Sequence, residues 1–421
     1  MKMKKKQKSV GVIGATAIGI GGMMGAGLYT LIGLATASTG EWLPIAFIIG
    51  GFVAAFSVYS YSKLGAKFPS RGGAAQFLLS CFGDGLIAGG LNVFQYFGWI
   101  IAMALYASGF AEYVCDLTGL SQNSWISKGI SVGIINLLGS KKVARAQTII
   151  VSLELIILLI FIVVGFTKAK IPTPSFSSNR GLGIISAAGL LYVTYEGFGV
   201  ITNAAGNMSD PKRQLPRAMF LSLAIVTVIY VITSIVVVTT LGTKGAIANQ
   251  GHALAEAGKA VLGPVGHYGI GLAALVATAS AVNSTMFGDE NLGLRIAKVG
   301  EIPSQFGAMT KLKGPKGLFI TAGLTAIFVV VFPLSAVGEM ASLAFLLVYA
   351  SVNIGHLRVY KKTGAKRSLL WIAIILNLVL FVFLFGQTII KGEVMTWLSV
   401  IIMLALSFFL EWIWEKRHTI I

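Results

Sequence analysis

Long apolar runs without charged residues recur along this chain and constrain its fold more than any other feature. Hydrophobic residues make up 56% of the 421 residues, and only 11% are charged. A soluble protein of this length could not cover its surface with so few polar side chains, whereas about 20 consecutive apolar residues let a helix cross a bilayer. The composition therefore predicts an all-α membrane protein that crosses the bilayer many times.

The apolar runs divide into twelve predicted transmembrane helices, which together form a single transmembrane domain over residues 1–421. With the N-terminus placed in the cytoplasm, 26 of the 33 lysine and arginine residues lie on the cytoplasmic side and seven on the other. This asymmetry is typical of membrane proteins, so we expect both termini to be cytoplasmic and the protein to lie in the plasma membrane. The predicted spans are residues 10–37, 43–65, 83–114, 124–139, 143–166, 181–207, 215–241, 266–298, 317–332, 335–357, 368–390 and 394–414.

The sequence also makes predictions for two polar segments, one before the first span and one between the seventh and eighth spans. The lysine-rich residues 1–10 precede the first span without a small-residue cleavage site, so we expect this span to be retained rather than removed as a signal peptide. Residues 246–263, between the seventh and eighth spans, are too polar to cross the membrane. They are expected to form one short external helix.

Several classes of protein are disfavoured by what the sequence lacks. The net charge of +18 comes from short basic clusters between apolar runs, without a basic patch of interleaved aromatics, so we predict no nucleic-acid partner. Cys81 and Cys115 have no metal-like spacing, and no phosphate-binding loop is present. We therefore expect no metal, no cofactor and no enzymatic activity. The histidines fall in loops or near span ends without a metal-like partner in sequence: His252, His267, His356 and His418.

Two predicted spans contain glycines where a continuous helix would be weakened. The first span includes GIGGMMGAG at residues 19–27, and the sixth includes LYVTYEGFGVITNAAGN, with Gly197 and Gly199 near its middle. The two spans are five apart, and an odd offset gives the second unit the opposite orientation in the membrane. Paired discontinuous helices in inverted repeats indicate a binding site. The predicted units are residues 10–166 for the first inverted repeat, 181–357 for the second, and 368–414 for two additional helices.

A helix break inside the membrane has a specific chemical consequence. It leaves backbone N–H and C=O groups at the bilayer midplane, which is costly unless something pairs them. Helix N-termini attract a carboxylate and helix C-termini attract an ammonium, so a zwitterion fits such a break. The alternative is that the glycines only let helices pack closely. We favour binding for residues 21–27 with 197–199, and packing for most other glycines.

Four motifs resemble the amino acid–polyamine–organocation (APC) superfamily of transporters, which have the LeuT-type fold with a 5+5 inverted repeat. The pattern is most similar to that of prokaryotic proton-coupled amino acid transporters, and it extends from residue 10 to about residue 360. The motifs are MMGAGLY at 23–29, GSKKVARAQTIIVSLELIILL at 139–159, TYEGFGVITNAAGNMSDPKRQLPRAM at 194–219 and AKVGEIP at 297–303.

The resemblance implies a substrate site built on the two unwound segments. The substrate carboxylate would meet backbone N–H groups of the first segment, and its ammonium would meet backbone carbonyls of the second. Tyr195 and Phe198 would line or gate the side-chain pocket. Met23 and Met24 flank the first segment, and lipid-facing or core packing explains them equally well. The implied backbone partners are Gly25, Ala26 and Gly27 for the carboxylate, and Val193, Thr194 and Glu196 for the ammonium.

Two acidic residues lie inside predicted spans, Glu154 in the fifth and Glu196 at the break in the sixth. An ionised carboxylate at that depth costs several kcal/mol, so such residues are functional by default. We expect Glu154 to carry a coupling proton, with a structural carboxyl as the alternative. Glu196 would favour cationic substrates, take a proton, or brace the break. The candidate polar neighbours of Glu154 are Ser280, Asn283 and Ser284 in the eighth span.

The predicted function is secondary active transport of amino acids by alternating access, with protons as coupling ions and membrane lipids as surroundings. Proton-driven relatives carry a lysine where this chain has Glu154, so sodium coupling stays open. Amino acid exchange is a further alternative, and an amino-acid-sensing receptor is a more distant one.

Overall fold

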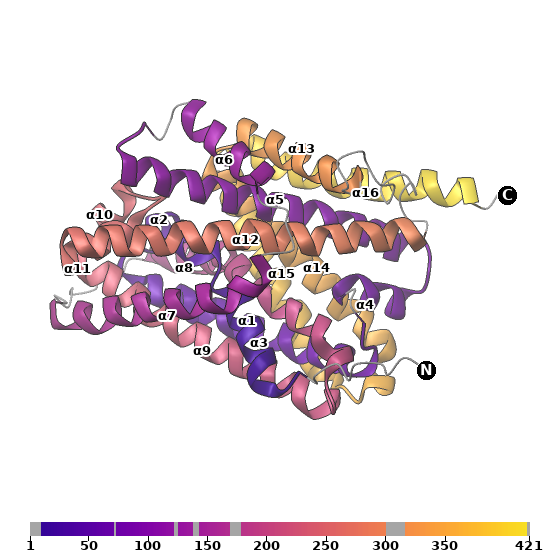
Figure 1. Cartoon of the computed structure of the whole chain (residues 1–421). Helices are drawn as coiled ribbons and strands as arrows, with labels where there is room; N and C mark the ends of the chain where they lie inside the picture. The colour runs from indigo at the N-terminus through magenta and orange to yellow at the C-terminus, as the bar shows by residue number, and fades with distance from the viewer. Residues whose placement is uncertain are drawn as a thin grey trace, which may run out of the picture.

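The computed structural model describes residues 10–70, 73–121, 125–137, 143–168, 178–299 and 316–418. These residues form sixteen α-helices and two 3₁₀-helices, and they contain no β-strand (Figure 1). In chain order the elements are α1 (Val12–Met23), α2 (Ala26–Thr39), η1 (Gly40–Trp42), α3 (Leu43–Lys67), α4 (Gly73–Phe82), α5 (Leu86–Thr118), α6 (Trp125–Leu137), α7 (Val143–Lys168), α8 (Ser178–Leu191), η2 (Tyr192–Asn207), α9 (Pro211–Thr240), α10 (Gly242–Ala248), α11 (Ala253–Leu262), α12 (Pro264–Val299), α13 (Lys316–Val331), α14 (Leu334–Thr363), α15 (Arg367–Ile390) and α16 (Val394–His418).

The long helices run roughly side by side as one bundle (Figure 1). Within the described residues, nine helical stretches are long and apolar enough to cross a membrane, which makes this a multi-pass membrane protein. The start of α1 and the end of α16 lie at one end of the bundle, while α10 and α11 lie at the other (Figure 1).

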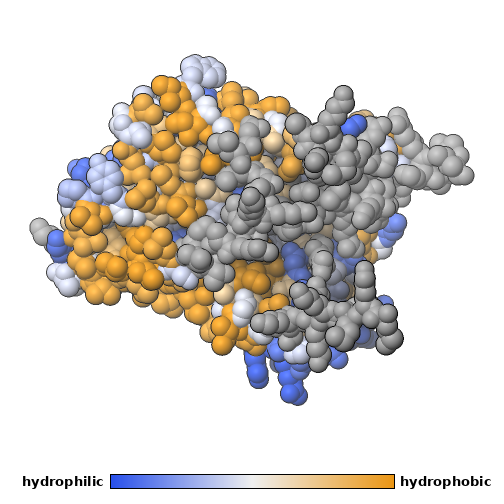
Figure 2. All heavy atoms as spheres, in the orientation of Figure 1, coloured by the Kyte–Doolittle hydropathy of each residue, from blue (hydrophilic) through white to orange (hydrophobic). Residues whose placement is uncertain are grey.

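The outer surface of the bundle is apolar, as contact with lipid requires. On α7, Leu153, Ile156, Leu159 and Val163 each leave more than half of their surface exposed. Figure 2 shows hydrophobic side chains across a broad part of the visible face, with hydrophilic ones towards its margins. In water such a surface would aggregate, so the exposed apolar residues mark where the acyl chains lie.

Burial separates the central elements of the bundle from the peripheral ones. In the most apolar part of each span, 83% of α14 and 78% of α5 are buried, against 28% of α7 and 28% of α16. The stretch that joins α8 to η2 is also 83% buried. The interrupted sixth span is therefore one of the innermost elements.

The structure changes two details of the predicted helix pattern. The fourth and ninth predicted spans correspond to the short helices α6, with 13 described residues, and α13, with 16. A separate helix, α4, precedes α5 because Gly83 (φ 82°) and Gly85 (φ 148°) turn the chain in conformations that favour glycine. The structure has two external helices, α10 and α11, where the sequence predicted one. The Asn249 side chain donates to the Gly245 carbonyl and ends α10 there.

Candidate functional site

The first span is broken where the sequence predicts it. The helix α1 ends at Met23, and the Met24 N–H makes its last bond to the Ile20 carbonyl at 2.7 Å. The chain then turns at Gly25, whose backbone is extended (φ −70°, ψ −151°), and α2 begins at Ala26 without a side-chain cap. The N–H groups of the first turn of α2, and the positive end of its dipole, therefore lie inside the protein.

The sixth span is interrupted in a different way from the prediction. The α-helix stops at Leu191, but the chain continues as a 3₁₀-helix from Tyr192 to Asn207, passing through Gly197 and Gly199 without a break. A 3₁₀ stretch of more than three or four residues is uncommon and often marks a hinge or a strained sequence. The prediction of a break at the two glycines is therefore corrected to a change of helix type that begins at Tyr192.

The two interruptions lie against each other. A β-carbon on Gly197 would collide with the backbone of Gly22 and would lie 2.5 Å from the Met23 nitrogen. A β-carbon on Gly27 would lie 2.9 Å from Cγ2 and 3.1 Å from Cα of Thr194. The glycines thus allow backbone-to-backbone packing, which is the alternative that the sequence left open, and this packing brings the two segments together.

Tyr230 in α9 joins the two interruptions. Its hydroxyl lies 2.5 Å from the Met23 carbonyl, at the end of α1, and 3.2 Å from the Thr194 carbonyl, just past the end of α8. A hydroxyl has one hydrogen to donate, so the two carbonyls share it. Sequence reasoning missed this residue, although a single tyrosine in the apolar run VTVIYVITS was a signal.

The other carbonyls at the junction between α8 and η2 are bonded mostly by α14. The Tyr349 hydroxyl donates to the Glu196 carbonyl at 2.9 Å, and the Ser342 hydroxyl donates to the Leu190 carbonyl at 2.5 Å. The Thr194 hydroxyl donates to the Leu191 carbonyl at 2.7 Å. Buried carbonyls must be paired, so these hydroxyls stabilise the change of helix type.

The remaining predicted site residues pack in the interior. Tyr195 donates its hydroxyl to the Phe47 carbonyl in α3 at 2.8 Å. The ring of Phe198 lies 5.0 Å from that of Tyr349 between centroids. Met23, Met24 and Val193 are buried, so neither methionine faces lipid.

Both intramembrane carboxyl groups are buried, with 4% of each residue exposed. Within the described residues, Glu154 Oε1 and Glu196 Oε2 make no hydrogen bond. Tyr29 in α2 lies beside the Glu154 carboxyl, close enough for its hydroxyl to interact with that group. The sequence did not predict this neighbour.

The predicted polar neighbours of Glu154 lie on α12, which packs along α7. The Ser284 hydroxyl donates to the Ala281 carbonyl of its own helix at 3.1 Å. Ser280 is buried and Asn283 is half-buried. The structure thus places these three residues on a helix that packs against α7, and it places Tyr29 next to the carboxyl itself.

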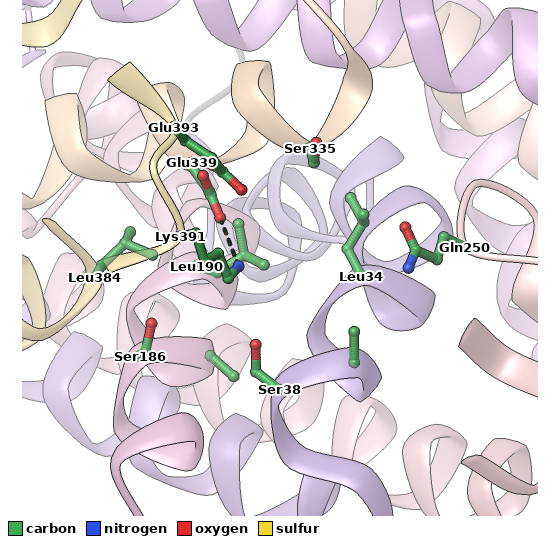
Figure 3. A pocket seen from close by; sticks show the side chains of 12 residues that line it. Leu34, Ser38, Ser186, Leu190, Gln250, Ser335, Glu339, Leu384, Lys391 and Glu393 are labelled. Atoms are coloured by element: carbon green, nitrogen blue, oxygen red, sulfur yellow. Dashed lines mark hydrogen bonds and ion pairs between the residues drawn. The ribbon is translucent and has the colours of Figure 1, made fainter. Parts of the chain in front are cut away.

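A cavity of about 220 Å³ lies between α2, α8, α14 and α15 (Figure 3). Lys391 and Glu339 form an ion pair on one side of it at 3.3 Å, with Glu393 beside them (Figure 3). Leu190, in the last turn of α8, also lines it, whereas none of the predicted site residues does. The cavity therefore approaches the junction between α8 and η2 without including it.

Fold and site together define a multi-pass membrane protein with two interrupted spans that meet in its interior. A sequence profile described as amino acid permease matches residues 10–410. The chain is 33% identical to an uncharacterized protein of Methanocaldococcus jannaschii, over 91% of this chain and 90% of that protein. It is 28% identical to the inner membrane transport protein YbaT of Escherichia coli, over 89% of each chain. The branched-chain amino acid permease BcaP of Lactococcus lactis is 25% identical over 83% of this chain and 81% of its own.

The chain belongs to the amino acid permease family of the APC superfamily. Two of these three relatives are named as a transport protein and a permease, and together with the family they support amino acid transport as the activity of this chain.

Proposed function

We propose that this protein is a secondary active transporter that binds an α-amino acid between the two interruptions and moves it with a proton. The observation that carries the proposal is the start of α2 at Ala26, inside the protein and without a side-chain cap, next to Thr194 at the start of η2. A substrate carboxylate would accept bonds from the N–H groups of Gly25, Ala26 and Gly27.

The substrate ammonium would donate to carbonyls on the other interruption. The carbonyls of Thr194 and Glu196 each accept one hydroxyl, from Tyr230 and Tyr349 respectively. Inside the 3₁₀-helix each of these carbonyls also accepts the N–H three residues on, so the ammonium would take the place of a tyrosine hydroxyl. Backbone recognition of this kind selects the α-carboxylate and α-ammonium groups that all α-amino acids share.

The proposed architecture is a 5+5 inverted repeat with twelve spans and both termini in the cytoplasm. Its first unit runs from α1 to α7, its second from α8 to α14, and α15 and α16 are additional. The presence of an interruption in the first span of each unit supports this arrangement. Alternating access would then be a rocking of one group of helices against the other around the site.

Glu154 is the proposed proton carrier. Its carboxyl is buried, with Oε1 unbonded in the described part of the chain, and an ionised group there would cost several kcal/mol. A neutral carboxyl that ionises when the site opens to water would load and release one proton in each cycle. Tyr29 and Glu154 lie on α2 and α7, so movement between these helices changes the surroundings of the carboxyl.

The first test is uptake of a labelled amino acid panel into proteoliposomes, with an inward proton gradient and no sodium. Accumulation above equilibrium is the expected result. Uptake only into vesicles preloaded with amino acid would replace symport by exchange, and accumulation only with sodium would replace the coupling ion. Absence of uptake under all three conditions would contradict the transport proposal and favour a receptor.

The second test is Glu154→Gln, with Glu411→Gln as the matched control. Glu411 is also a buried carboxyl, but it packs against Gly89 of α5. We expect Glu154→Gln to abolish accumulation driven by the proton gradient and to retain substrate binding in detergent, while Glu411→Gln retains both. Proton-driven accumulation by Glu154→Gln at the level of the unaltered protein would contradict the coupling role.

A further inference from the structure

Four ionisable side chains, one from α5 and three from residues 252–267, meet near the start of α11, which lies at one end of the bundle (Figure 1). Asp116 comes from the last turn of α5, His252 precedes α11, Glu256 is in the first turn of α11, and His267 is in the first turn of α12. The side chains of Asp116 and His252 are each 9% exposed, and that of His267 is 12% exposed. This is a half-enclosed polar cluster at the margin of the apolar bundle.

The distances in this cluster are longer than those of strong hydrogen bonds. Asp116 Oδ1 lies 3.5 Å from His252 Nε2, and Asp116 Oδ2 lies 3.5 Å from His267 Nε2. His267 Nδ1 lies 3.4 Å from Glu256 Oε1. Charge-assisted hydrogen bonds are about 2.7 to 2.9 Å long. Among the described residues, Asp116 Oδ2 and His267 Nδ1 are buried atoms without a hydrogen bond.

The two contacts of His267 use its two ring nitrogens, Nε2 with Asp116 and Nδ1 with Glu256, so a single ion would take only one of these nitrogens. Tetrahedral bonds of about 2.1 Å place neighbouring ligand atoms about 3.4 Å apart. One ligand atom from each of Asp116, Glu256 and His267 lies within 4.8 Å of the other two. The three ligand atoms therefore lie close together, and side-chain movements of about 1 Å would bring them to the spacing of metal ligands.

We propose that Asp116, Glu256 and His267 bind a divalent transition-metal ion, with His252 as the fourth ligand. Imidazole and carboxylate together suit zinc and its neighbours in the first transition row. Calcium and magnesium take sets of oxygen ligands instead. Zinc is the expected ion.

Lys259 gives this proposal a second consequence. Its ammonium forms an ion pair with Glu256 Oε1 at 3.4 Å, and 57% of its side chain is exposed. It competes with the ion for the same carboxylate and can turn out into solvent. Loss of Lys259 should therefore strengthen metal binding, whereas loss of a ligand should weaken it.

The ion would join α5 to two consecutive helices, α11 and α12, that lie far from it in sequence. It would link the end of α5 to the starts of α11 and α12, and bound protein should therefore resist thermal unfolding more than metal-free protein. Before folding, these ligands are separated by more than a hundred residues between Asp116 and His252, so the site exists only in the folded chain.

The test uses the full chain, purified without an affinity tag, stripped with a chelator and titrated with zinc chloride by calorimetry. We expect one saturable site per chain, a higher melting temperature with zinc, and intense visible absorption when cobalt(II) is used as the tetrahedral probe. His267→Ala and Asp116→Asn should each weaken zinc binding by at least about 10-fold, and Lys259→Ala should strengthen it.

Asp116→Asn keeps the size of the side chain, so it tests the ligand even if His267→Ala folds poorly. Equal zinc affinity in the unaltered protein and in Asp116→Asn would overturn the proposal. So would the lack of any saturable zinc binding by the stripped chain. Because binding is measured without transport, neither result depends on the transport proposal.

Discussion

The first interruption leaves helix N–H groups without a capping side chain, whereas the second keeps helical bonding and gives its carbonyls to hydroxyl donors from other helices. At the first, the chain passes through Gly25 between two short α-helices. At the second, the backbone changes to a 3₁₀-helix. Tyr230 and Tyr349 donate to carbonyls of this helix, and Ser342 donates to a carbonyl at the end of α8. The two interruptions therefore present opposite chemistry: N–H donors without a capping side chain at the first, and carbonyl acceptors bonded by hydroxyls at the second.

The contact between Gly22 and Gly197 holds the two interruptions together. Its disruption should have the largest effect on the free energy of unfolding. Gly197→Ala places a methyl group where the backbone of Gly22 lies. Because backbone cannot move aside as a side chain can, we expect a loss of about 3 kcal/mol in the free energy of unfolding. The measurement is the denaturant midpoint of the purified protein in detergent.

Gly199→Ala is the matched control for that change. It adds the same methyl group two residues away in the same 3₁₀-helix, where the nearest atom would be the Tyr349 hydroxyl oxygen at 3.6 Å. We expect its midpoint to stay close to that of the unaltered protein. Equal losses for the two variants would show that helix type, rather than packing, decides the effect.

Removal of the shared hydroxyl should separate the two interruptions without a steric clash. Tyr230→Phe removes the hydroxyl that the Met23 and Thr194 carbonyls share, which we expect to cost about 2 kcal/mol and to weaken binding of the amino acid. Calorimetric titration with the transported amino acid checks the binding. Tyr96→Phe, which removes a hydroxyl bonded to Thr321, should leave that affinity unchanged; a similar loss in both variants would contradict the bridging role of Tyr230.

The smallest effect is expected where only the second interruption is touched. Tyr349→Phe removes the donor to the Glu196 carbonyl and leaves the first interruption intact. We expect a loss of about 1 kcal/mol, measured by the same denaturant midpoint. A loss larger than that of Tyr230→Phe would mean that the 3₁₀-helix depends more on α14 than on α9.

The sequence predicted the apolar helices and the first interruption well, because both follow from local properties. Charge-free runs determine where spans lie, and glycines next to an apolar run weaken an α-helix wherever they occur. The break between Met23 and Ala26 falls within the glycine cluster for this reason.

The second interruption and the neighbours of the carboxyl group depend on tertiary contacts, which a sequence does not display. Gly197 and Gly199 look alike in the chain, yet only Gly197 lies against another backbone. The pairing of Glu154 with Tyr29 joins residues more than a hundred positions apart. The same holds for the cluster of Asp116 with His252 and His267, where spacing along the chain gave no indication of a shared site.

The 3₁₀-helix also has a mechanical consequence. A residue rises about 2.0 Å along a 3₁₀-helix and about 1.5 Å along an α-helix. The 16 residues of η2 are therefore about 8 Å longer than the same residues in an α-helix. Each residue that changes from 3₁₀ to α-helical geometry brings the two ends of η2 closer by about 0.5 Å. It also rotates one end relative to the other by about 20°. Conversion of one 3₁₀ turn beside Tyr192 to an α-helical turn would therefore shorten the span. It would also rotate the segments on either side of that turn relative to each other about the axis of the span.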